Sequence, residues 1–271
     1  MNLVRFPSIW FGLWPLLVLS GSGSMAAEAD GPLSAGEVIG RAVSRAQQAE
    51  ARAGQTAYTY TKLTFTEELD ATGRVKERKE KVYQVVFQNG LTHLNLLTVN
   101  GHPPAQADLK KQLENEANAR KILGKSKIAR GGPNRENFLT PELVARFNFI
   151  LIGEESIDGR GAYRVAFEPM RPGPPVHHIV ERLLDRLSGT VWIDAEEFEI
   201  ARAEINLASE IDLLGGVVGS LKKLAYTMTR TRLGEGLWFN TLSAGDFEGR
   251  RLLESLRIKT RSQSINFRPV G

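Results

Sequence analysis

The stretch Gly189-Thr190-Val191-Trp192-Ile193-Asp194, followed shortly by Ile200-Ala201-Arg202-Ala203-Glu204, decides the fold. Residues 189–194 predict a strand, residues 195–197 predict a turn, and residues 199–209 predict a second strand that returns along the first. Because only a short turn joins these two strands, we expect them to pair antiparallel.

Similar hairpins are predicted on both sides of this stretch. Turn residues separate runs that have the period of two typical of strands. The predicted strands are residues 57–68, 75–88, 91–99, 149–157, 162–168, 221–233, 237–246 and 252–267, with a turn at Glu248-Gly249 before the last of them. About ten strands in hairpin order predict one antiparallel sheet. A sheet of that length curls, closes or exposes its edges.

Helices are predicted at the start and in the middle of the chain. Residues 33–53 form an amphipathic pattern, with Ser34 and Glu37 as a capping box. Residues 104–123 are helix-like and heavily charged, and Thr140-Pro141 is a typical helix start. The expected fold class is therefore α+β, mainly antiparallel β, with helices that cover the concave face of a curled sheet.

The first 26 residues have the pattern of a secretory signal. A positively charged start precedes an apolar run, and small residues follow at the positions that a signal peptidase reads. The apolar run has about half of the ~20 residues that a membrane span needs, so we expect cleavage near Ala26 rather than an anchor. The mature chain, residues 27–271, is expected to be a single periplasmic domain with a helical and loop insert at 102–147 and no transmembrane segment.

Composition excludes several classes of function. The 271 residues include no cysteine, which excludes disulfides, thiol catalysis and the lipid-acceptor cysteine of a bacterial lipoprotein. The net charge of +4 is spread along the chain, and residues 76–81 mix charges of both signs. A nucleic-acid surface needs clustered and unbalanced basic charge, so we expect no nucleic-acid partner.

No residue set indicates catalysis, a cofactor or a metal. His177, His178 and Glu181 form the best metal-like cluster, but a third ligand is missing, and a polar loop or helix face is the simpler interpretation. Residues 215–220 are rich in glycine but lack the ending of a phosphate-binding loop. We expect a protein that is not an enzyme; a hydrolase that uses His177, His178 and Glu181 is the third-ranked alternative.

Aromatic and aliphatic residues instead recur on single faces of the predicted strands. Such faces form either an ordinary packed core or the lining of an open cavity, and both alternatives stay open at this point. A cavity of this kind would bind acyl chains, because burial contributes about 0.8 kcal/mol per methylene. The candidate cavity residues are Leu63, Phe65, Tyr83, Val85, Phe87, Phe149, Tyr163, Phe167, Trp192, Tyr226, Met228 and Trp238, and the candidate lid residues are Val38, Val43, Leu143 and Phe147.

The order of these parts resembles a known family. A signal peptide, a helix, the strand Ala57-Tyr58-Thr59-Tyr60, a long hairpin, a helical insert and the 189–204 hairpin follow one another. This order is similar to that of the periplasmic lipoprotein-carrier superfamily (LolA/LolB/RseB-like), especially its outer-membrane lipoprotein-sorting branch. The resemblance implies an unclosed β-barrel of about ten or eleven strands with a helical lid, which holds lipoprotein acyl chains and carries them across the periplasm.

Two functions are expected on this basis. The first is non-enzymatic binding and transport of lipid or lipoprotein acyl chains in an apolar cavity, in outer-membrane lipoprotein sorting. The alternative is a protein-interaction or sensor module on the same fold that recognises a membrane-associated partner. Its contact surfaces would be the hairpin tip at residues 76–81 and the loop at residues 124–137.

Overall fold

The computed structural model describes residues 32–51, 57–88, 91–123, 139–213, 219–251 and 254–270. The predicted signal peptide (residues 1–26) and the predicted loop at 124–137 lie outside these residues. Helices and strands follow one another as α1 (Ala35–Ala51), β1 (Ala57–Leu69), β2 (Val75–Gln88), β3 (Leu91–Val99), α2 (Gln106–Leu123), α3 (Pro141–Val144), β4 (Phe147–Ile157), β5 (Arg160–Pro169), α4 (Ile179–Leu184), β6 (Leu187–Asp194), β7 (Ile200–Leu207), β8 (Ile211–Leu213), β9 (Gly219–Gly234), β10 (Leu237–Arg251) and β11 (Glu254–Pro269).

The strands form one antiparallel sheet that stays open. Within the described residues the sheet has eleven strands in the order β3-β2-β1-β11-β10-β9-β7-β6-β5-β4, and β8 pairs with β9 beside this path. The edge strands β3 and β4 do not pair with each other, so the sheet is not closed into a barrel. The predicted fold class, a mainly antiparallel sheet of about ten or eleven strands with a few helices, is confirmed.

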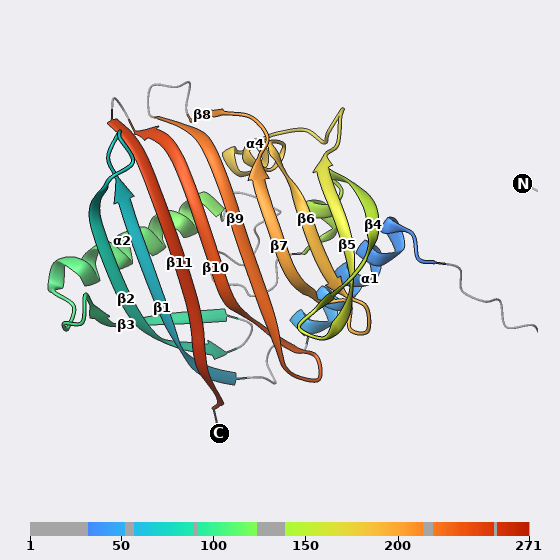
Figure 1. Ribbon diagram of the computed structural model, residues 1–271, viewed down its shortest axis with the longest axis horizontal. Coiled ribbons are helices and arrows are strands. Elements are labelled where there is room, and N and C mark those ends of the chain that lie inside the picture. Colours follow the sequence, from blue (N-terminus) through green and yellow to red (C-terminus); the bar gives the residue numbers. More distant parts are fainter. Residues whose placement is uncertain are drawn as a thin grey trace, which may run out of the picture. The chain divides into compact units, whose positions relative to one another are not determined.

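The helices lie on one side of the sheet, where its strands curve (Figure 1). We call this side of the sheet the inner face and the opposite side the outer face. α1 lies at the end formed by β4, β5 and β6, and α2 lies behind β1 and β2 in this view. The inner face is therefore the place where a ligand could be enclosed.

Local sequence signals explain several element ends. Ser34 and Glu37 form the predicted capping box: Ser34 Oγ accepts from the Glu37 N–H at 3.3 Å, and Glu37 Oε2 accepts from the Ser34 N–H at 2.8 Å. Thr140 caps α3, because its side chain accepts from the Leu143 N–H at 3.2 Å. α3 has only four residues, so the predicted helix start is confirmed, but the chain enters β4 after little more than one turn.

The turn expected at Glu248-Gly249 is wrong. Both residues lie inside β10, where Glu248 pairs with Arg257 and Gly249 pairs with Leu256. A Cβ atom on Gly249 would lie 2.3 Å from the Ser220 carbonyl oxygen, so glycine is needed there for the close approach of β9. Gly249 therefore marks an irregularity between two paired strands and not the end of a strand.

Candidate functional site

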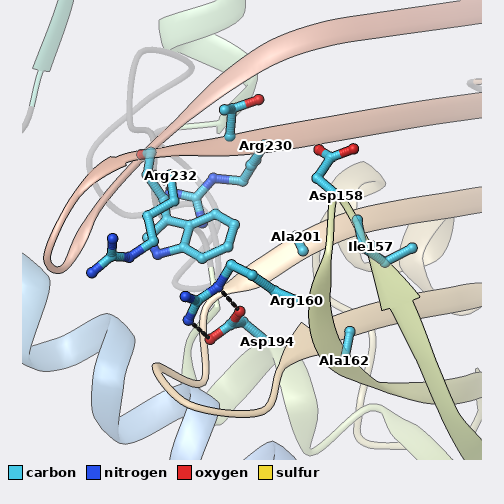
Figure 2. Close-up of a pocket in the computed structure, with 10 residues that line it drawn as sticks. Ile157, Asp158, Arg160, Ala162, Asp194, Ala201, Arg230 and Arg232 are labelled. Carbon is cyan, nitrogen blue, oxygen red and sulfur yellow. Dashed lines mark hydrogen bonds and ion pairs between the residues drawn. The ribbon is translucent and has the colours of Figure 1, made fainter.

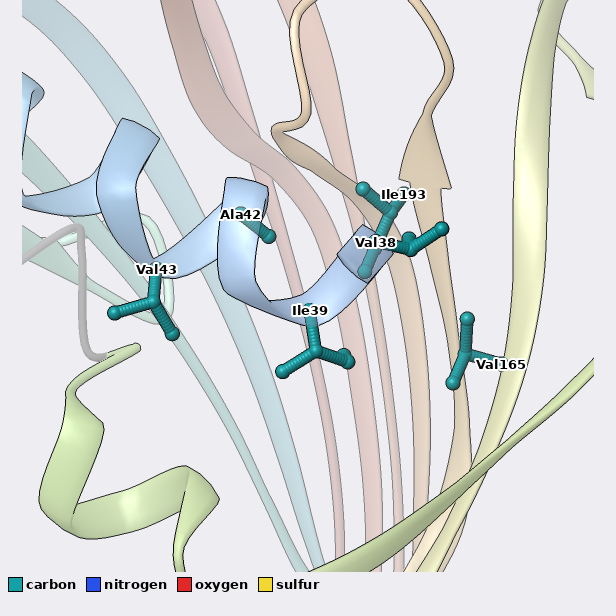
Figure 3. Packing of buried hydrophobic residues seen from close by; sticks show 6 residues of the cluster. All are labelled: Val38, Ile39, Ala42, Val43, Val165 and Ile193. Carbon is teal, nitrogen blue, oxygen red and sulfur yellow. The ribbon is translucent and has the colours of Figure 1, made fainter. Parts of the chain in front are cut away.

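α1 seals one end of the inner face with apolar side chains. Val38, Ile39, Ala42 and Val43 are buried and follow helical spacing, so they form one stripe along the helix. They pack against inner-face residues of β5 and β6, including Val165 (Figure 3). Complete burial of one such side chain contributes about 1.5–3 kcal/mol, so this stripe fixes α1 on the sheet.

A polar anchor holds the other end of α1. Arg45 Nε lies 3.2 Å from Glu199 Oε1, and Arg45 Nη2 donates to the Gly236 carbonyl at 2.8 Å. Arg230 Nη1 donates to the second oxygen of Glu199 at 2.8 Å. All three charged side chains are largely buried. α1 is thus tied to the β6–β7 and β9–β10 hairpins as well as to the core.

An aromatic cluster covers the inner face near the opposite edge of the sheet. Tyr60, Val85, Phe87 and Phe239 are its buried members. The Phe239 ring lies 5.3 Å from the Phe87 ring and 5.8 Å from the Tyr60 ring, at the edge-to-face angles that aromatic pairs prefer. Half-buried apolar residues pack around these, namely Tyr58, Tyr83, Leu94, Leu237 and Phe267.

Polar side chains separate this aromatic cluster from the apolar seat of α1. On β1 and β11 the inner-face positions carry hydroxyl groups, and Thr64 Oγ1 lies 3.1 Å from Ser262 Oγ. Further along, β9 returns to apolar character with Tyr226 and Met228, and Met228 belongs to a small buried cluster with Ala203. The inner face is therefore apolar at both ends, with a polar strip between them at Thr64 and Ser262.

α2 turns polar side chains toward the sheet. Asp108 lies 3.8 Å from Lys79, and Gln112 Nε2 donates to the Leu94 carbonyl at 3.0 Å. Leu109 and Leu113, two of the apolar residues of this charged helix, are 42% and 66% exposed. Leu109 and Leu113 thus lie largely outside any described core, and within the described residues no helix contributes an apolar side chain to the aromatic cluster.

The environment beneath α2 shifts two pKa values. Burial raises the pKa of Tyr83, and the nearby Glu116 carboxylate raises it further. Burial lowers the pKa of Lys81, with smaller effects from Lys79 and Lys111. Both shifts follow from removal of polar groups from water, so the space between α2 and the sheet is partly screened from solvent.

Most of the candidate cavity residues lie on the inner face. The strand registers place there Tyr83, Val85, Phe87, Phe149, Tyr163, Phe167, Tyr226 and Met228. They belong to different places, because the first three contribute to the aromatic cluster and Phe149 and Tyr163 pack near α1.

Three candidates do not share that face. Tyr83 pairs with Lys62, so Leu63 and Phe65 lie on the outer face of β1, and Phe65 is 40% exposed. Trp192 is also on the outer face, where the Arg164 and Arg202 guanidiniums lie 5.7 Å and 4.9 Å from its ring. The expectation that these residues line one hollow with Tyr83 is corrected, since neighbouring residues of a strand point to opposite faces.

Trp238 and the candidate lid residues have other surroundings. Trp238 follows the β9–β10 turn, and its Nε1 donates to Glu197 at 2.7 Å. Val38 and Val43 are buried in the α1 stripe, whereas Leu143 is half-buried in α3. Phe147 is the first residue of β4, where its ring lies 5.3 Å from Phe167, so it belongs to the sheet and not to a lid helix.

Sequence reasoning missed Phe239 and Phe267, which are members of the aromatic cluster. Ser264 lies on the inner face, so strict alternation would place Phe267 on the outer face. Asn266 has a φ of 59°, and the register shifts nearby, which brings Phe267 onto the Tyr60 ring at 4.7 Å. An asparagine in a strand is a weak bulge signal, because asparagine tolerates positive φ better than most residues do.

The cluster of His177, His178 and Glu181 is structural. Glu181 accepts from the backbone N–H groups of both histidines, at 2.7 Å and 3.3 Å, and its carboxylate lies 3.6 Å from Arg146. The pKa of Glu181 is lowered, and the hydrogen bond from the His177 N–H is the largest cause. Burial of the carboxyl group acts in the opposite direction but is outweighed. Across the described ranges, no group of three or more His, Cys, Asp or Glu side chains is placed to hold a metal ion.

The outer face carries a groove of about 1120 Å³ across β2, β1, β11, β10 and β9. Thr227, Leu242 and Ala244 lie along it, with Phe65 and Arg261 from the neighbouring strands. Leu242 is 50% exposed. This groove combines exposed apolar side chains with charges, so it is an accessible surface and not an enclosed site.

Together these features define an open antiparallel sheet whose inner face is partly apolar and carries helices. No family model matches the chain, and no curated protein matches it. None of the helices in the described part of the chain has the length and apolar character required to cross a membrane.

Solved structures with a similar fold include a LolA superfamily protein from Nitrosomonas europaea, at a TM-score of 0.37 and 13% identity over 89% of this chain and 95% of that chain. A DUF1329 family protein from Desulfovibrio piger has a TM-score of 0.34 and 13% identity over 85% and 92%. A domain described as a putative outer membrane lipoprotein-sorting protein, from Vibrio parahaemolyticus, has a TM-score of 0.34 and 11% identity over 85% of this chain and 93% of that chain. The first and third of these bear the names of the superfamily and the branch that the sequence resembles.

Proposed function

We propose that the chain binds acyl chains of lipids or lipoproteins on its inner face, in the periplasm, and that it acts without catalysis in outer-membrane lipoprotein sorting. One observation carries this proposal. Apolar side chains recur on the inner face from Phe87 of β2 to Phe149 of β4, and among the described helices α1 packs an apolar stripe against one end of it, where Val144 of α3 also packs. α2 presents Asp108 and Gln112 to the remainder, so an apolar ligand there would contact the half-buried members of the aromatic cluster, such as Tyr83.

The physical basis of binding would be dehydration. An acyl chain that lies against half-buried side chains such as Tyr83 and Tyr226 removes apolar surface of both partners from water. The hydroxyl groups of Thr64 and Ser262 lie between the two apolar regions. They can donate hydrogen bonds to polar parts of the same ligand and accept hydrogen bonds from them. An amphipathic ligand therefore suits this face better than a purely apolar one.

The test combines lipid analysis with a matched pair of variants. Lipid extraction and mass spectrometry of the purified protein should reveal a bound lipid, and a fluorescent fatty acid should bind. Leu224→Asp places a charge on the inner face, where Leu224 pairs with Phe247, and should weaken fatty-acid binding at least tenfold. Leu242→Asp changes the exposed outer face of the next strand and should bind as well as the native chain. Empty preparations that take up no fatty acid would contradict the proposal.

A protein-interaction module remains the second candidate, because the β1–β2 hairpin projects a charged and exposed tip. Residues 71–78 are all exposed, and ion pairs such as Arg78–Glu67 at 2.7 Å and Lys76–Glu68 at 3.0 Å hold the two strands of the tip together. Replacement of residues 70–78 by a two-residue turn should abolish capture of a periplasmic membrane-protein partner and leave fatty-acid uptake unchanged. Loss of uptake in that variant would argue against a separate contact surface.

A further inference from the structure

A small cavity lies where three hairpins meet at one end of the sheet. Its volume is about 150 Å³, and its walls come from β4, β5, β6, β7, β9 and β10 (Figure 2). Ala162 and Ala201 leave the space open because their side chains are short, and both are buried. Arg160, Arg230 and Arg232 also line it. We call this space the arginine cavity.

The buried carboxylates around the arginine cavity already have full sets of donors. Asp194 accepts from Arg160 Nε at 2.6 Å and Nη2 at 2.9 Å, and from the backbone N–H groups of Glu196 and Glu197 at 3.1 Å and 2.7 Å. Glu197 accepts from Arg232 Nε at 2.6 Å and from Trp238 Nε1 at 2.7 Å. These carboxylates have little accepting capacity left for further donors.

Several N–H donors of the cavity arginines, by contrast, have no acceptor within the described residues. Arg230 is only 6% exposed; its Nη1 donates to Glu199 at 2.8 Å and its Nη2 donates to the Trp238 carbonyl at 2.9 Å. Its Nε is buried and has no hydrogen-bond partner. Within the described residues, no acceptor is bound by Arg160 Nη1 or by the two Nη atoms of Arg232. A buried donor without a partner costs about 1–3 kcal/mol, so an occupant that accepts from Arg230 Nε would stabilise the fold.

Charged side chains of both signs surround the arginine cavity. Four guanidiniums lie in or beside the cavity: those of Arg45 and Arg230 share Glu199 and are largely buried, whereas the side chains of Arg160 and Arg232 are 26% and 33% exposed. Three largely buried carboxylates oppose them: Asp194, Glu197 and Glu199. Asp158 and Glu196 are exposed to solvent, which screens their charges. Among the residues that line the cavity itself, three arginines face the two carboxylates of Asp158 and Asp194.

We propose that the arginine cavity binds a small oxyanion, either a carboxylate or a phosphate. Guanidinium groups match the geometry of both, and the available volume suits a group of that size. The group can come from a free anion in solution or from the head of a lipid. Glu199 connects the cavity to Arg45 of α1, so an occupied cavity would also stabilise the polar anchor of that helix.

Titration calorimetry of the full chain at constant ionic strength tests this site. Inorganic phosphate and acetate are the free anions, and a short-chain phosphatidic acid supplies a lipid head. Arg232→Gln removes one guanidinium from the cavity wall but spares the more deeply buried Arg230, and it should weaken phosphate binding at least tenfold. Arg202→Gln is the matched control, because Arg202 stacks on Trp192 outside the cavity, and it should bind phosphate as the native chain does.

A second measurement guards against a folding defect. Ala201→Leu fills the cavity without a change in charge and should abolish phosphate binding, while the circular dichroism spectrum stays native. Phosphate also stabilises proteins without a specific site, so a rise in Tm counts in favour only if it is smaller in Arg232→Gln than in Arg202→Gln. Equal heats in those two variants, or no heat in the native chain, would overturn the proposal. Fatty-acid uptake is measured separately, so either proposal can fail alone.

Discussion

A methyl group has no room at position 189. A Cβ atom there would lie 1.9 Å from the Glu204 carbonyl oxygen and 3.0 Å from the Phe167 ring. Gly189→Ala should therefore lower the free energy of unfolding by about 3 kcal/mol, because β6 and β7 must separate or bend to admit the methyl group. Urea denaturation measures this loss.

The control for that change is Gly40→Ala, in α1, where no atom lies within 4 Å of the added methyl group. Since glycine is a poor helix former, the free energy of unfolding of this variant should rise by about 0.5–1 kcal/mol. A similar loss in both variants would contradict the packing argument at position 189.

Asp194 gives the stability of the chain a dependence on pH. Burial alone would raise the pKa of its carboxyl group, but the Arg160 guanidinium and the Glu197 N–H outweigh burial and lower that pKa. The ionised group therefore stabilises the fold at neutral pH, and this contribution disappears as the pH falls through the lowered pKa. Asp194→Asn should cost about 2–4 kcal/mol at pH 7.

In acid, the free energy of unfolding of Asp194→Asn should differ less from that of the native chain than it does at pH 7. Below about pH 4 the carboxyl group of the unfolded chain takes up a proton while the native group, with its lowered pKa, still stays ionised, so the gap between the two urea midpoints should narrow. A gap that stays constant from pH 7 to pH 3 would show that Asp194 acts through its shape and not through its charge.

The candidate site could be predicted from sequence only where strand parity was unambiguous. Val75–Gln88 concentrates its apolar residues at Tyr83, Val85 and Phe87 on one face, and the structure places all three together. β1 carries apolar residues on both faces, so the choice of Leu63 and Phe65 over Tyr58 and Tyr60 had no physical basis until the register was known. Phe267 was out of reach for a related reason, since a bulge reverses its face.

At the scale of elements, α1 owes its position to a few buried side chains. Ile39→Ala removes a buried side chain from the contact with the sheet and should cost about 2–4 kcal/mol, because a cavity remains. Gln47→Ala, on the exposed side of the same helix, should change the free energy of unfolding by less than about 0.5 kcal/mol. Urea denaturation of both variants measures the difference, and equal effects would contradict the position assigned to α1.

α2 should open far more easily than α1. None of its side chains within residues 106–118 is buried, and Leu113 is largely exposed, so its amides are protected by little beyond the helix itself. Hydrogen exchange followed by mass spectrometry should show fast exchange in residues 106–123 and slow exchange in residues 38–46. Equal protection of both helices would mean that α2 has packing contacts beyond those described.

Helix existence was predictable for both elements, but the side that faces the sheet was predictable only for α1. The α1 stripe is unbroken from Val38 to Ala46, which leaves one possible orientation. The apolar side of α2 is too thin to decide, and Asp108 and Gln112 are held by a lysine and a backbone carbonyl of the sheet instead. Polar contacts of this kind have no periodic signature in a sequence.

At the scale of the whole sheet, the edge strand β4 exposes apolar residues beside unpaired backbone. Ile150 is 58% exposed on the outer face of this strand. Exposed edges with apolar side chains favour association between chains, so Ile150→Lys should slow aggregation at high concentration. Static light scattering measures this, and the free energy of unfolding should stay within about 0.5 kcal/mol.

Leu242→Lys is the control for that edge, because Leu242 is equally apolar and comparably exposed but lies in the interior strand β10. It should reduce aggregation less than Ile150→Lys does. The reverse order would locate the association surface in the outer groove.

The unpaired ends of the sheet have a mechanical consequence. In a closed cylinder of strands the circumference is set by the number of strands and their stagger, and it cannot change unless a ladder of hydrogen bonds breaks. Here β3 and β4 are joined to their neighbours on one side only. The span between them can widen or narrow through small changes of twist at each of the intervening ladders, so the acyl ligands proposed above could differ in width while every strand pair stays intact.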